Sequence, residues 1–388
     1  MRRAVVAGAV TAVVGYTGAF AVVLTGLQGV GASPTQAASG LAVLCLTMGL
    51  ATIFLAVRHR MPITIAWSTP GAALLASTGV PAGGWPAAVF AFIVVGVLLL
   101  ITGLVPWLGR VVSSIPTALA QAMLAGVLVP ICLAPVKAVI ISPWVVAPVL
   151  VAWLAMLAWK PKWAAAVSVG LALVIAVFAV AAGPGLASLP APGTPLEFVM
   201  PQPSLPAVIG VALPLWLVTM ASQNIPGIAV LGTYGFRAPW RSALVTTGIG
   251  TVVGAPFGGH AINFAAISAA LAASPDAGEK ASGRWRAAVV AGLGYLVFGG
   301  ITATVTALVF TGPPGLLQAA AGVALLGTLG SSLLGAISEA EGREAAVVTF
   351  LVAASGISVF GIGAAFWALA AGLIVRWVVV ELRARLAR

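Results

Sequence analysis

Two opposite backbone preferences follow one another in the stretch Met61-Pro62-Ile63-Thr64-Ile65-Ala66-Trp67-Ser68-Thr69-Pro70-Gly71. Its β-branched residues favour extended backbone, whereas a hydroxyl residue followed by proline is typical of the first turn of a helix. The stretch opens an uncharged segment, residues 61 to 109, that is long enough for two membrane crossings. Irregular backbone at membrane depth is tolerated only where protein or a water-filled cavity surrounds it. The stretch therefore predicts a broken crossing beside a site.

A second break is predicted after Ala255-Pro256-Phe257-Gly258-Gly259-His260, where residues 261 to 273 are expected to form a short helix. Residues 242 to 275 are too few for two complete crossings of about 20 residues each and a turn. The start of a half-helix directs unpaired N–H groups and the positive end of a dipole toward the membrane centre, which suits an anion. The alternative is that both breaks are kinks that serve helix packing.

The composition excludes a water-soluble globule. Of the 388 residues 61% are hydrophobic and only 6% are charged, against roughly a quarter charged in ordinary soluble domains. The net charge of +11 is spread over basic residues that stand singly or in pairs, so they indicate membrane topology rather than binding of nucleic acid. Cys45 and Cys132 lie far apart in apolar stretches, which favours neither a disulfide framework nor a metal cluster.

Dividing the uncharged stretches by about 20 residues per crossing predicts an all-α polytopic membrane protein with fourteen crossings. With both termini in the cytoplasm, nearly all of the 18 Lys and Arg residues fall in inner loops, as the positive-inside rule requires. The Pro-rich stretch 183–206 divides the chain after seven crossings. Because seven is odd, two homologous halves would form an inverted repeat, in which the discontinuous crossings are the third and the tenth.

Four motifs carry a resemblance to a known family. They are Gly29-Val30-Gly31-Ala32-Ser33-Pro34 with Gln36-Ala37-Ala38-Ser39-Gly40, the stretch 61–73, Thr219-Met220-Ala221-Ser222-Gln223-Asn224-Ile225-Pro226-Gly227, and Ala255-Pro256-Phe257-Gly258-Gly259-His260-Ala261-Ile262-Asn263. Over nearly its whole length the chain resembles the benzoate/proton symporters, or benzoate membrane transport proteins. That family looks like a distant relative of the uracil, xanthine and sulfate permeases, which share a fold of 7+7 inverted segments.

The resemblance implies a division into core and gate. Crossings 1 to 4 (residues 4–109) and 8 to 11 (205–311) would form the core, and crossings 5 to 7 (110–182) and 12 to 14 (313–388) the gate. It also implies a secondary active transporter in the bacterial plasma membrane that imports benzoate or a similar small aromatic carboxylate with protons, by alternating access. An uncoupled channel or uniporter for small anions is the alternative, and a homodimer through the gate helices is left open.

One departure from the wider group is informative. The nucleobase permeases use a carboxylate on crossing 8 and usually another on crossing 10, whereas this chain has Gln223 and Asn224, then Gly259, His260 and Asn263. Its seven acidic residues fall in loops or at the ends of crossings. A site without fixed negative charge favours an anionic substrate. The sequence places no paired carboxylates, metal-ligand cluster or Cys/His dyad at membrane depth, which argues against an enzyme and a cofactor. It also has no G-x-x-x-x-G-K-(S/T) loop, which argues against hydrolysis of a nucleotide.

The polar candidates for substrate binding lie at the two breaks and on crossing 8. His260 is expected to donate to the substrate carboxylate and to carry the symported proton, since an ionisable residue at membrane depth is costly to keep; the alternative is a neutral histidine at the helix start. Gln223, Asn224 and Asn263 are expected to bind substrate, with interhelical hydrogen bonding as the alternative for the first two. Ser68 and Thr69 would present hydroxyl and N–H groups, or merely cap the helix.

An aromatic substrate also needs apolar and aromatic walls. The nearest candidates in sequence are Tyr16 and Phe20 on crossing 1, Trp67 before the first half-helix, and Phe257 and Phe264 around the second. The alternative for each is packing inside the bundle.

Overall fold

The computed structural model describes the whole chain except residues 114, 267, 340–341, 361 and 383–388. The helices of the first part are α1 (Arg2–Thr17), α2 (Phe20–Gly29), α3 (Pro34–His59), α4 (Thr69–Thr78), α5 (Gly84–Leu104), α6 (Pro106–Ser113), α7 (Thr117–Ile141), α8 (Pro143–Trp159) and α9 (Ala164–Ala182). Those of the second part are α10 (Leu205–Ala207), α11 (Leu213–Thr219), α12 (Ile225–Thr233), α13 (Trp240–Gly254), α14 (Ala269–Ala273), α15 (Trp285–Gly300), α16 (Thr302–Thr311), α17 (Leu316–Ile337), α18 (Arg343–Ala354) and α19 (Ala364–Arg376). The strands are β1 (Ile65–Trp67), β2 (Ile262–Phe264), β3 (Ser358–Val359) and β4 (Ile362–Gly363).

Seven helical segments of the described chain are long and apolar enough to cross a membrane, and an eighth is added if the bent pair α15–α16 counts as one span. The structure is thus a helical membrane protein, as its composition predicts. The shorter apolar helices 143–159 and 364–380 fall below the length of these spans. The exact number of fourteen crossings stays a prediction.

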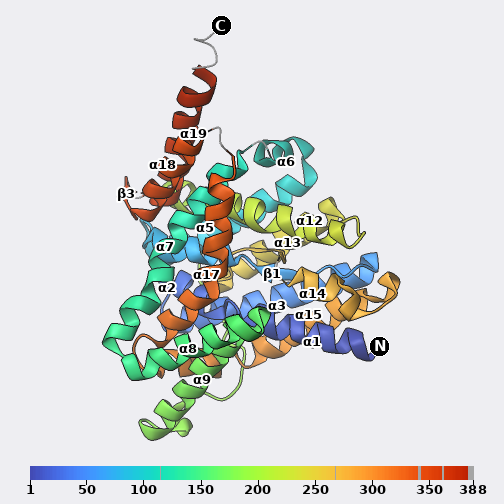
Figure 1. Cartoon of the computed structure of the whole chain (residues 1–388), viewed down its shortest axis with the longest axis vertical. Coiled ribbons are helices and arrows are strands. Elements are labelled where there is room, and N and C mark those ends of the chain that lie inside the picture. Colours follow the sequence, from blue (N-terminus) through green and yellow to red (C-terminus); the bar gives the residue numbers. More distant parts are fainter. Residues whose placement is uncertain (114, 267, 340–341, 361, 383–388) are drawn as a thin grey trace.

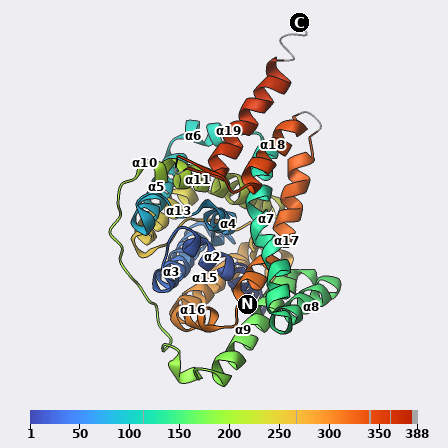
Figure 2. The same ribbon diagram turned by 90° about the vertical axis from the view of Figure 1, so that its left-hand side faces the viewer.

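The helices form two groups, which Figure 2 separates clearly. One group holds α1 to α5, α13 and α15, in which α3 packs on α15 and α5 on α13. The other holds α7, α8, α9, α17, α18 and α19, in which α7 packs on both α17 and α18, and α9 on α8 and α17. Between α9 and α10 the chain runs as a long connection over the outside of the first group, where the N–H of Val199 donates to the carbonyl of Pro256 at 2.8 Å.

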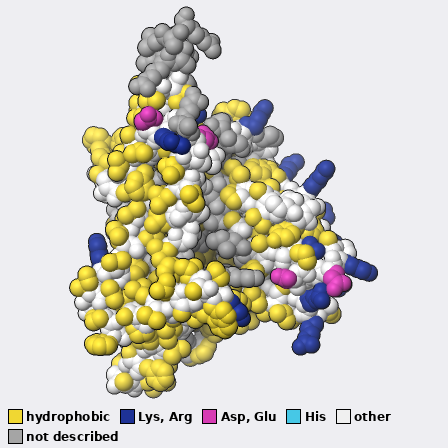
Figure 3. All heavy atoms as spheres, viewed as in Figure 1, with side chains coloured by type: hydrophobic (Ala, Val, Ile, Leu, Met, Phe, Trp, Pro, Cys, Tyr) yellow, Lys and Arg dark blue, Asp and Glu magenta, His cyan; other side chains and the backbone are white. Residues whose placement is uncertain are grey.

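The surface seen in Figure 3 is mostly hydrophobic, as expected for a protein surrounded by lipid. Most of the Lys and Arg side chains visible there gather at the edge near which α1 begins (Figures 1 and 3). The cytoplasmic position of both termini stays a prediction.

The first predicted break is confirmed. The extended residues of β1 are followed directly by α4, whose N-cap is Ser68 and whose first turn contains Pro70. The Ser68 hydroxyl accepts a hydrogen bond from the N–H of Gly71 at 3.2 Å. Local sequence thus sets this break, because a hydroxyl cap and a proline in the first turn both favour a helix start at Thr69.

The second break differs from its prediction, because residues 261 to 264 are not helical. Residues Ile262–Phe264 form β2, and α14 begins only at Ala269. The prediction of one helix over 261–273 was wrong because these residues find their partners in β1, far away in sequence. Hydrogen bonds between two strands satisfy the backbone N–H and C=O groups at membrane depth, as the hydrogen bonds of a helix would.

β1 and β2 form an antiparallel two-stranded ribbon at the centre of the molecule. Its register pairs Ile65 with Phe264, Ala66 with Asn263 and Trp67 with Ile262. Two further bonds extend it, since the N–H of Ser68 donates to the carbonyl of Ala261 and the N–H of Ala265 to that of Thr64, each at 2.9 Å. Both breaks are therefore built into one piece of backbone.

Two threonines support the ribbon in matching ways. Thr52 on α3 accepts a hydrogen bond from the N–H of Ile65 at 2.9 Å. Thr251 on α13 accepts one from the N–H of Ile262 at 3.2 Å. Each strand thus has one N–H satisfied by a threonine from the helix that precedes it in the chain.

The helix pairs that flank the ribbon cross at glycines. A Cβ added at Gly49 of α3 would lie 2.9 Å from the carbonyl oxygen of Gly292 on α15, and one added at Gly292 would lie 2.8 Å from that of Gly49. In the pair α5–α13, a Cβ added at Gly96 would lie 2.9 Å from the carbonyl oxygen of Gly248, and one added at Gly248 would lie 2.8 Å from that of Gly96. Such close backbone approach is typical of small-residue interfaces in membranes.

Candidate functional site

A cavity of about 650 Å³ lies between the two groups of helices. We call it the central cavity. One wall comes from the ribbon and the helices around it: Val14, Gly15, Gly18, Ala19, Ala66, Trp67, Thr69, Gln223, Ala265, Ala266 and Ser268. The other comes from α8, α9, α17 and the residue Pro161: Trp153, Leu157, Pro161, Ala164, Ala165, Val323, Ala324, Leu325, Leu326, Gly327, Thr328 and Ser331. The volume is within the range of small-molecule sites, and the walls are mainly apolar with a few polar groups.

Three of the predicted site residues line the central cavity: Trp67, Thr69 and Gln223. They come from β1, from the first residue of α4 and from the π-helical turn Met220–Asn224. Among the described residues that line this cavity, none carries a charge. The site therefore offers an uncharged, weakly polar lining beside the start of a helix.

Thr69 and Ser68 are adjacent but have different surroundings. Thr69 is partly exposed to the cavity at the start of α4. Ser68 is buried, and besides capping the helix it accepts a hydrogen bond from the hydroxyl of Thr219 at 2.8 Å. The capping alternative therefore describes Ser68, and Thr69 is the hydroxyl that faces the cavity.

Gln223 is a nearly buried polar side chain of this wall. It is only 8% exposed, and its amide makes no hydrogen bond with any residue that the structure describes. It lies in a π-helical turn, a local irregularity that is frequent at functional sites. A primary amide can donate two hydrogen bonds and accept two, so Gln223 holds its full capacity available to a ligand.

Asn224 has the opposite role. Its Oδ1 accepts a hydrogen bond from the N–H of Phe264 at 3.0 Å, and its Nδ2 donates to the sulfur of Met220 at 3.2 Å. The side chain is fully buried and is not among those that line the central cavity. Asn224 thus joins crossing 8 to the ribbon, in agreement with the interhelical alternative.

His260 and Asn263 are buried away from the lining of the central cavity. The Nδ1 atom of His260 accepts a hydrogen bond from the N–H of Ala261 at 2.6 Å, and the imidazole lies edge-on to Phe92 with 6.4 Å between ring centres. Its Nε2 has no partner among the described residues. Asn263 lies on β2 rather than in a half-helix, and its Nδ2 donates to the carbonyl of Phe264 at 2.7 Å.

The predicted aromatic wall is reduced to one ring. Tyr16 is buried and stacks on Phe20 and Phe298, with 5.3 and 4.3 Å between ring centres. Its ring also lies 5.8 Å from that of Trp67, so it supports the cavity wall from behind. Phe264 is buried, and Phe257 packs against Phe198 at 5.8 Å. Trp67 alone of these rings lines the central cavity.

Sequence reasoning missed one hydroxyl group that lines this site and one that lies buried next to it. Ser268 lines the cavity and directly precedes α14; a serine just before an alanine-rich run was the available signal. The hydroxyl of Tyr295 on α15 touches the position that a Cβ of Gly15 would occupy. It is buried with no hydrogen-bond partner among the described residues. No local pattern places a tyrosine of α15 against a glycine of α1.

The comparisons with known proteins agree with this architecture. The family model described as benzoate membrane transport protein (BenE) matches residues 2–378. The chain is 38% identical over 368 residues to the inner membrane protein YdcO of Escherichia coli K12, covering 94% of this chain and 93% of that protein. It is 27% identical over 388 residues to the benzoate membrane transport protein of Acinetobacter baylyi, covering 98% and 96%.

Two solved structures have a similar fold. The transmembrane domain of the cyanobacterial bicarbonate transporter BicA superposes with a TM-score of 0.63 at 16% identity and covers 91% of this chain and 97% of its own. Murine solute carrier 26 family member A9, an anion transporter in the inward-facing state, superposes with a TM-score of 0.69 at 13% identity and covers 99% and 69%. At these identities the likeness concerns the fold alone.

Proposed function

Because the chain belongs to the benzoate membrane transport protein family, we propose that it imports benzoate or a similar small aromatic carboxylate together with protons, by alternating access. The chain is a multi-pass integral membrane transport protein rather than an enzyme, with relatives in the bacterial inner membrane. The observation that carries the proposed substrate class is the free amide of Gln223 beside the start of α4 in a mainly apolar cavity.

The proposed binding mode follows from the chemistry of this wall. The carboxylate lies at the start of α4, where the helix dipole favours negative charge, and accepts hydrogen bonds from Thr69 and Gln223. Hydrogen bonds to a charged acceptor are stronger than those between neutral groups. The aromatic ring lies against Trp67 and the small residues Gly15, Gly18 and Ala66, which leave room for it.

We further propose that the fold is the predicted 7+7 inverted repeat. Thr52 and Thr251 support the two strands in the same way. The glycine crossing of α3 with α15 likewise matches that of α13 with α5. These are the relations expected if crossings 2 and 9, and crossings 4 and 11, are equivalent.

In this arrangement residues 4–109 and 205–311 form the core, residues 110–182 and 313–388 form the gate, and both termini are cytoplasmic. A homodimer through the gate helices remains a prediction. Cross-linking of single cysteines on α18, in a variant without Cys45 and Cys132, tests it.

His260 stays the proposed proton carrier, through the ribbon rather than by direct contact in the central cavity. Its neighbour Ala261 accepts the hydrogen bond from the N–H of Ser68, the N-cap of α4. A change of charge on the buried imidazole therefore acts on the backbone that begins the first half-helix. The alternative for coupling is that the proton travels on the substrate carboxylate.

The decisive experiment is uptake of radiolabelled benzoate into proteoliposomes with and without an inward proton gradient. The wild type is expected to accumulate benzoate against its gradient, whereas Gln223→Ala should lose most uptake. Gln318→Ala, on an exposed position of α17, is the matched control. Uptake that never exceeds equilibrium would favour the uncoupled channel or uniporter. The absence of benzoate uptake by folded wild-type protein would refute the proposed substrate.

His260→Gln separates the two routes of the proton. If His260 carries it, the variant should still exchange benzoate across the membrane but no longer accumulate it. Accumulation by the variant equal to that of the wild type would assign the proton to the substrate instead.

A further inference from the structure

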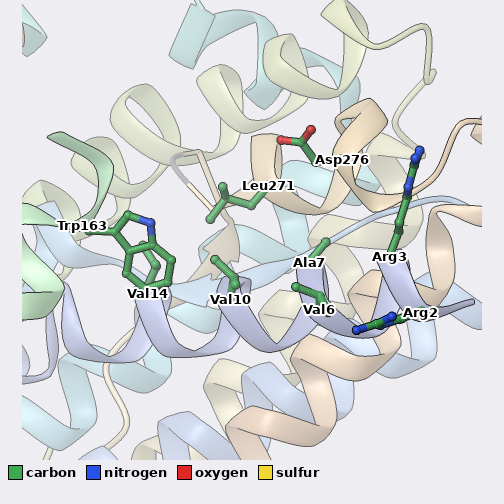
Figure 4. A pocket seen from close by; sticks show the side chains of 9 residues that line it. All are labelled: Arg2, Arg3, Val6, Ala7, Val10, Val14, Trp163, Leu271 and Asp276. Carbon is green, nitrogen blue, oxygen red and sulfur yellow. The ribbon is translucent and has the colours of Figure 1, made fainter. Parts of the chain in front are cut away.

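A second cavity, of about 370 Å³, lies beside the N-terminal half of α1. We call it the outer cavity. It is lined by Arg2, Arg3, Val6, Ala7, Val10, Val14, Trp163, Leu271 and Asp276 (Figure 4). These residues come from α1, from the turn before α9 and from α14 with the turn that follows it. Nothing in the proposed binding mode uses this cavity.

The outer cavity lies next to the central cavity along one face of α1. Val6, Val10 and Val14 recur every fourth residue, so they share a face of the helix, and Figure 4 shows them in a row that leads away from Arg2 and Arg3. Val14 lines both cavities. At 1.5 Å per residue the row extends about 12 Å along the axis. The two cavities are therefore neighbours along α1.

The opposite walls make the same transition. Trp163 lines the outer cavity, and the next residue, Ala164, lines the central one. Leu271 lines the outer cavity, and Ser268, one turn earlier, lines the central one. Three separate segments thus pass from one cavity to the other at the same level.

The charges of the outer cavity are confined to the residues nearest the N-terminus and to Asp276. Arg3 already has an acidic partner, because its Nη1 lies 2.8 Å from the Oε1 of Glu279 in an exposed ion pair. Asp276 lies in the turn after α14, above the valine row in Figure 4. Arg2 makes no ion pair with any residue that the structure describes. Asp276 likewise makes no ion pair with the described residues, and Figure 4 shows it across the valine row from Arg2. The outer cavity therefore combines an unpaired cation and a separate unpaired carboxylate with an apolar row and an indole ring.

We propose that the outer cavity is a second binding site for an aromatic carboxylate, on the side of the membrane where the N-terminus lies. The carboxylate lies near Arg2, and the ring lies on Val6 and Val10 with Trp163 at the inner end. This inference rests on the proposed function for the identity of the anion. It adds a site whose occupancy is measurable without transport.

The first test is protection of a cysteine placed in the valine row. Val10→Cys is introduced into the full chain, whose own Cys45 and Cys132 are only 0% and 7% exposed, and labelled with a water-soluble maleimide. Benzoate is expected to slow the labelling, whereas benzyl alcohol, which lacks the charge, and sulfate, which lacks the ring, should do so less. The protection should persist with Gln223→Ala, because the central cavity is not required for it.

A charge-matched pair of variants tests the role of Arg2. With Arg2→Gln the benzoate concentration that gives half protection should rise about two- to fivefold, as expected for a partly exposed charge interaction. Arg58→Gln, which removes an exposed cation that does not line the cavity, should leave it unchanged. Equal protection in both variants, or no protection by benzoate in the wild-type background, would overturn the proposal.

An anionic lipid headgroup is the other source of a negatively charged group at this level. Labelling is therefore repeated in vesicles of phosphatidylcholine alone and in vesicles with phosphatidylglycerol. Protection by benzoate in both kinds of vesicle supports the second binding site. Protection that comes from phosphatidylglycerol and does not depend on benzoate assigns the cavity to lipid and overturns the proposal. If wild-type protein shows protection by benzoate but no benzoate uptake, the proposed function is refuted while the second binding site is supported.

Discussion

The backbone N–H of Phe264 donates a hydrogen bond of 3.0 Å to the Oδ1 of Asn224. Strand β2 is thereby fixed to the π-helical turn that carries Gln223. Two consecutive amides thus have separate roles, one bound to the ribbon and one free at the central cavity. That separation leads to the first prediction.

Asn224→Ala should lower stability more than Gln223→Ala does. The substitution leaves the buried N–H of Phe264 without an acceptor, which costs about 1–3 kcal/mol. Gln223 has no protein partner to lose, so its alanine variant should keep the melting temperature and lose affinity for the substrate. Thermal unfolding in detergent and benzoate binding on the same samples measure both. Equal melting temperatures for the two variants would contradict the assignment.

Thr52→Val and Thr251→Val should destabilise the protein by similar amounts. Each replaces a buried hydroxyl by a methyl group of nearly the same shape and leaves one strand N–H unsatisfied, again about 1–3 kcal/mol. Thr47→Val is the control, because its hydroxyl bonds only to carbonyls of its own helix, at 2.9 and 3.3 Å. If one of the two ribbon variants is as stable as the control, the proposed equivalence of the two halves loses its best support.

Gly248→Ala should destabilise the protein, and Gly170→Ala should not. A Cβ at Gly248 would lie 2.7 Å from the backbone nitrogen of Leu100, so α13 and α5 would have to separate, whereas one at Gly170 would meet nothing within 4 Å. Overpacking of this kind typically costs about 1–3 kcal/mol. Alanine in the open position should instead stabilise α9 by about 0.5–1 kcal/mol. Melting temperatures that move in opposite directions would confirm the close crossing.

Arg284 should prove to be a positioning residue for the second break. It is buried, and its guanidinium donates to the carbonyls of Ala273 and Gly278, each at 2.8 Å. Arg284→Lys keeps the charge but cannot reproduce the fork of donors, so we expect a lower melting temperature and a raised KM for benzoate.

The control for Arg284 is Arg286→Gln, two positions along on an exposed site. Binding and melting unchanged by Arg284→Lys would show that the turn after α14 does not need the guanidinium fork.

The two breaks differ in how far sequence could predict them. The onset of α4 is local, because Ser68 and Pro70 specify a helix start within four residues. The onset of α14 is not set by local sequence, because Ile262–Phe264 form their hydrogen bonds with a strand nearly 200 residues earlier. Residues 261–264, which the sequence alone assigns to a helix, are extended there because the pairing partner exists.

The assignment of site residues has the same limit. Trp67, Thr69 and Gln223 were predicted to bind substrate and do line the central cavity, whereas His260 and Asn263 do not. Sequence spacing cannot separate Gln223 from Asn224, because a π-helical turn shifts the direction of successive side chains away from the 3.6-residue period. Ser268 belongs to this wall, and Tyr295 lies against Gly15 of the wall, only because α14 and α15 are brought against α1.

The ribbon also has a consequence for biosynthesis. When the ribosome has completed β1, its pairing partner β2 has not yet been made. Until then the backbone groups of Ile65 to Trp67 can be left in lipid only at a high energetic cost, so the first broken segment has to wait in a wetter place, at the membrane surface or beside the insertion machinery. Premature termination before Phe264 would thus leave the first broken segment without its pairing partner. Cells should degrade such fragments faster than fragments that end just beyond Phe264.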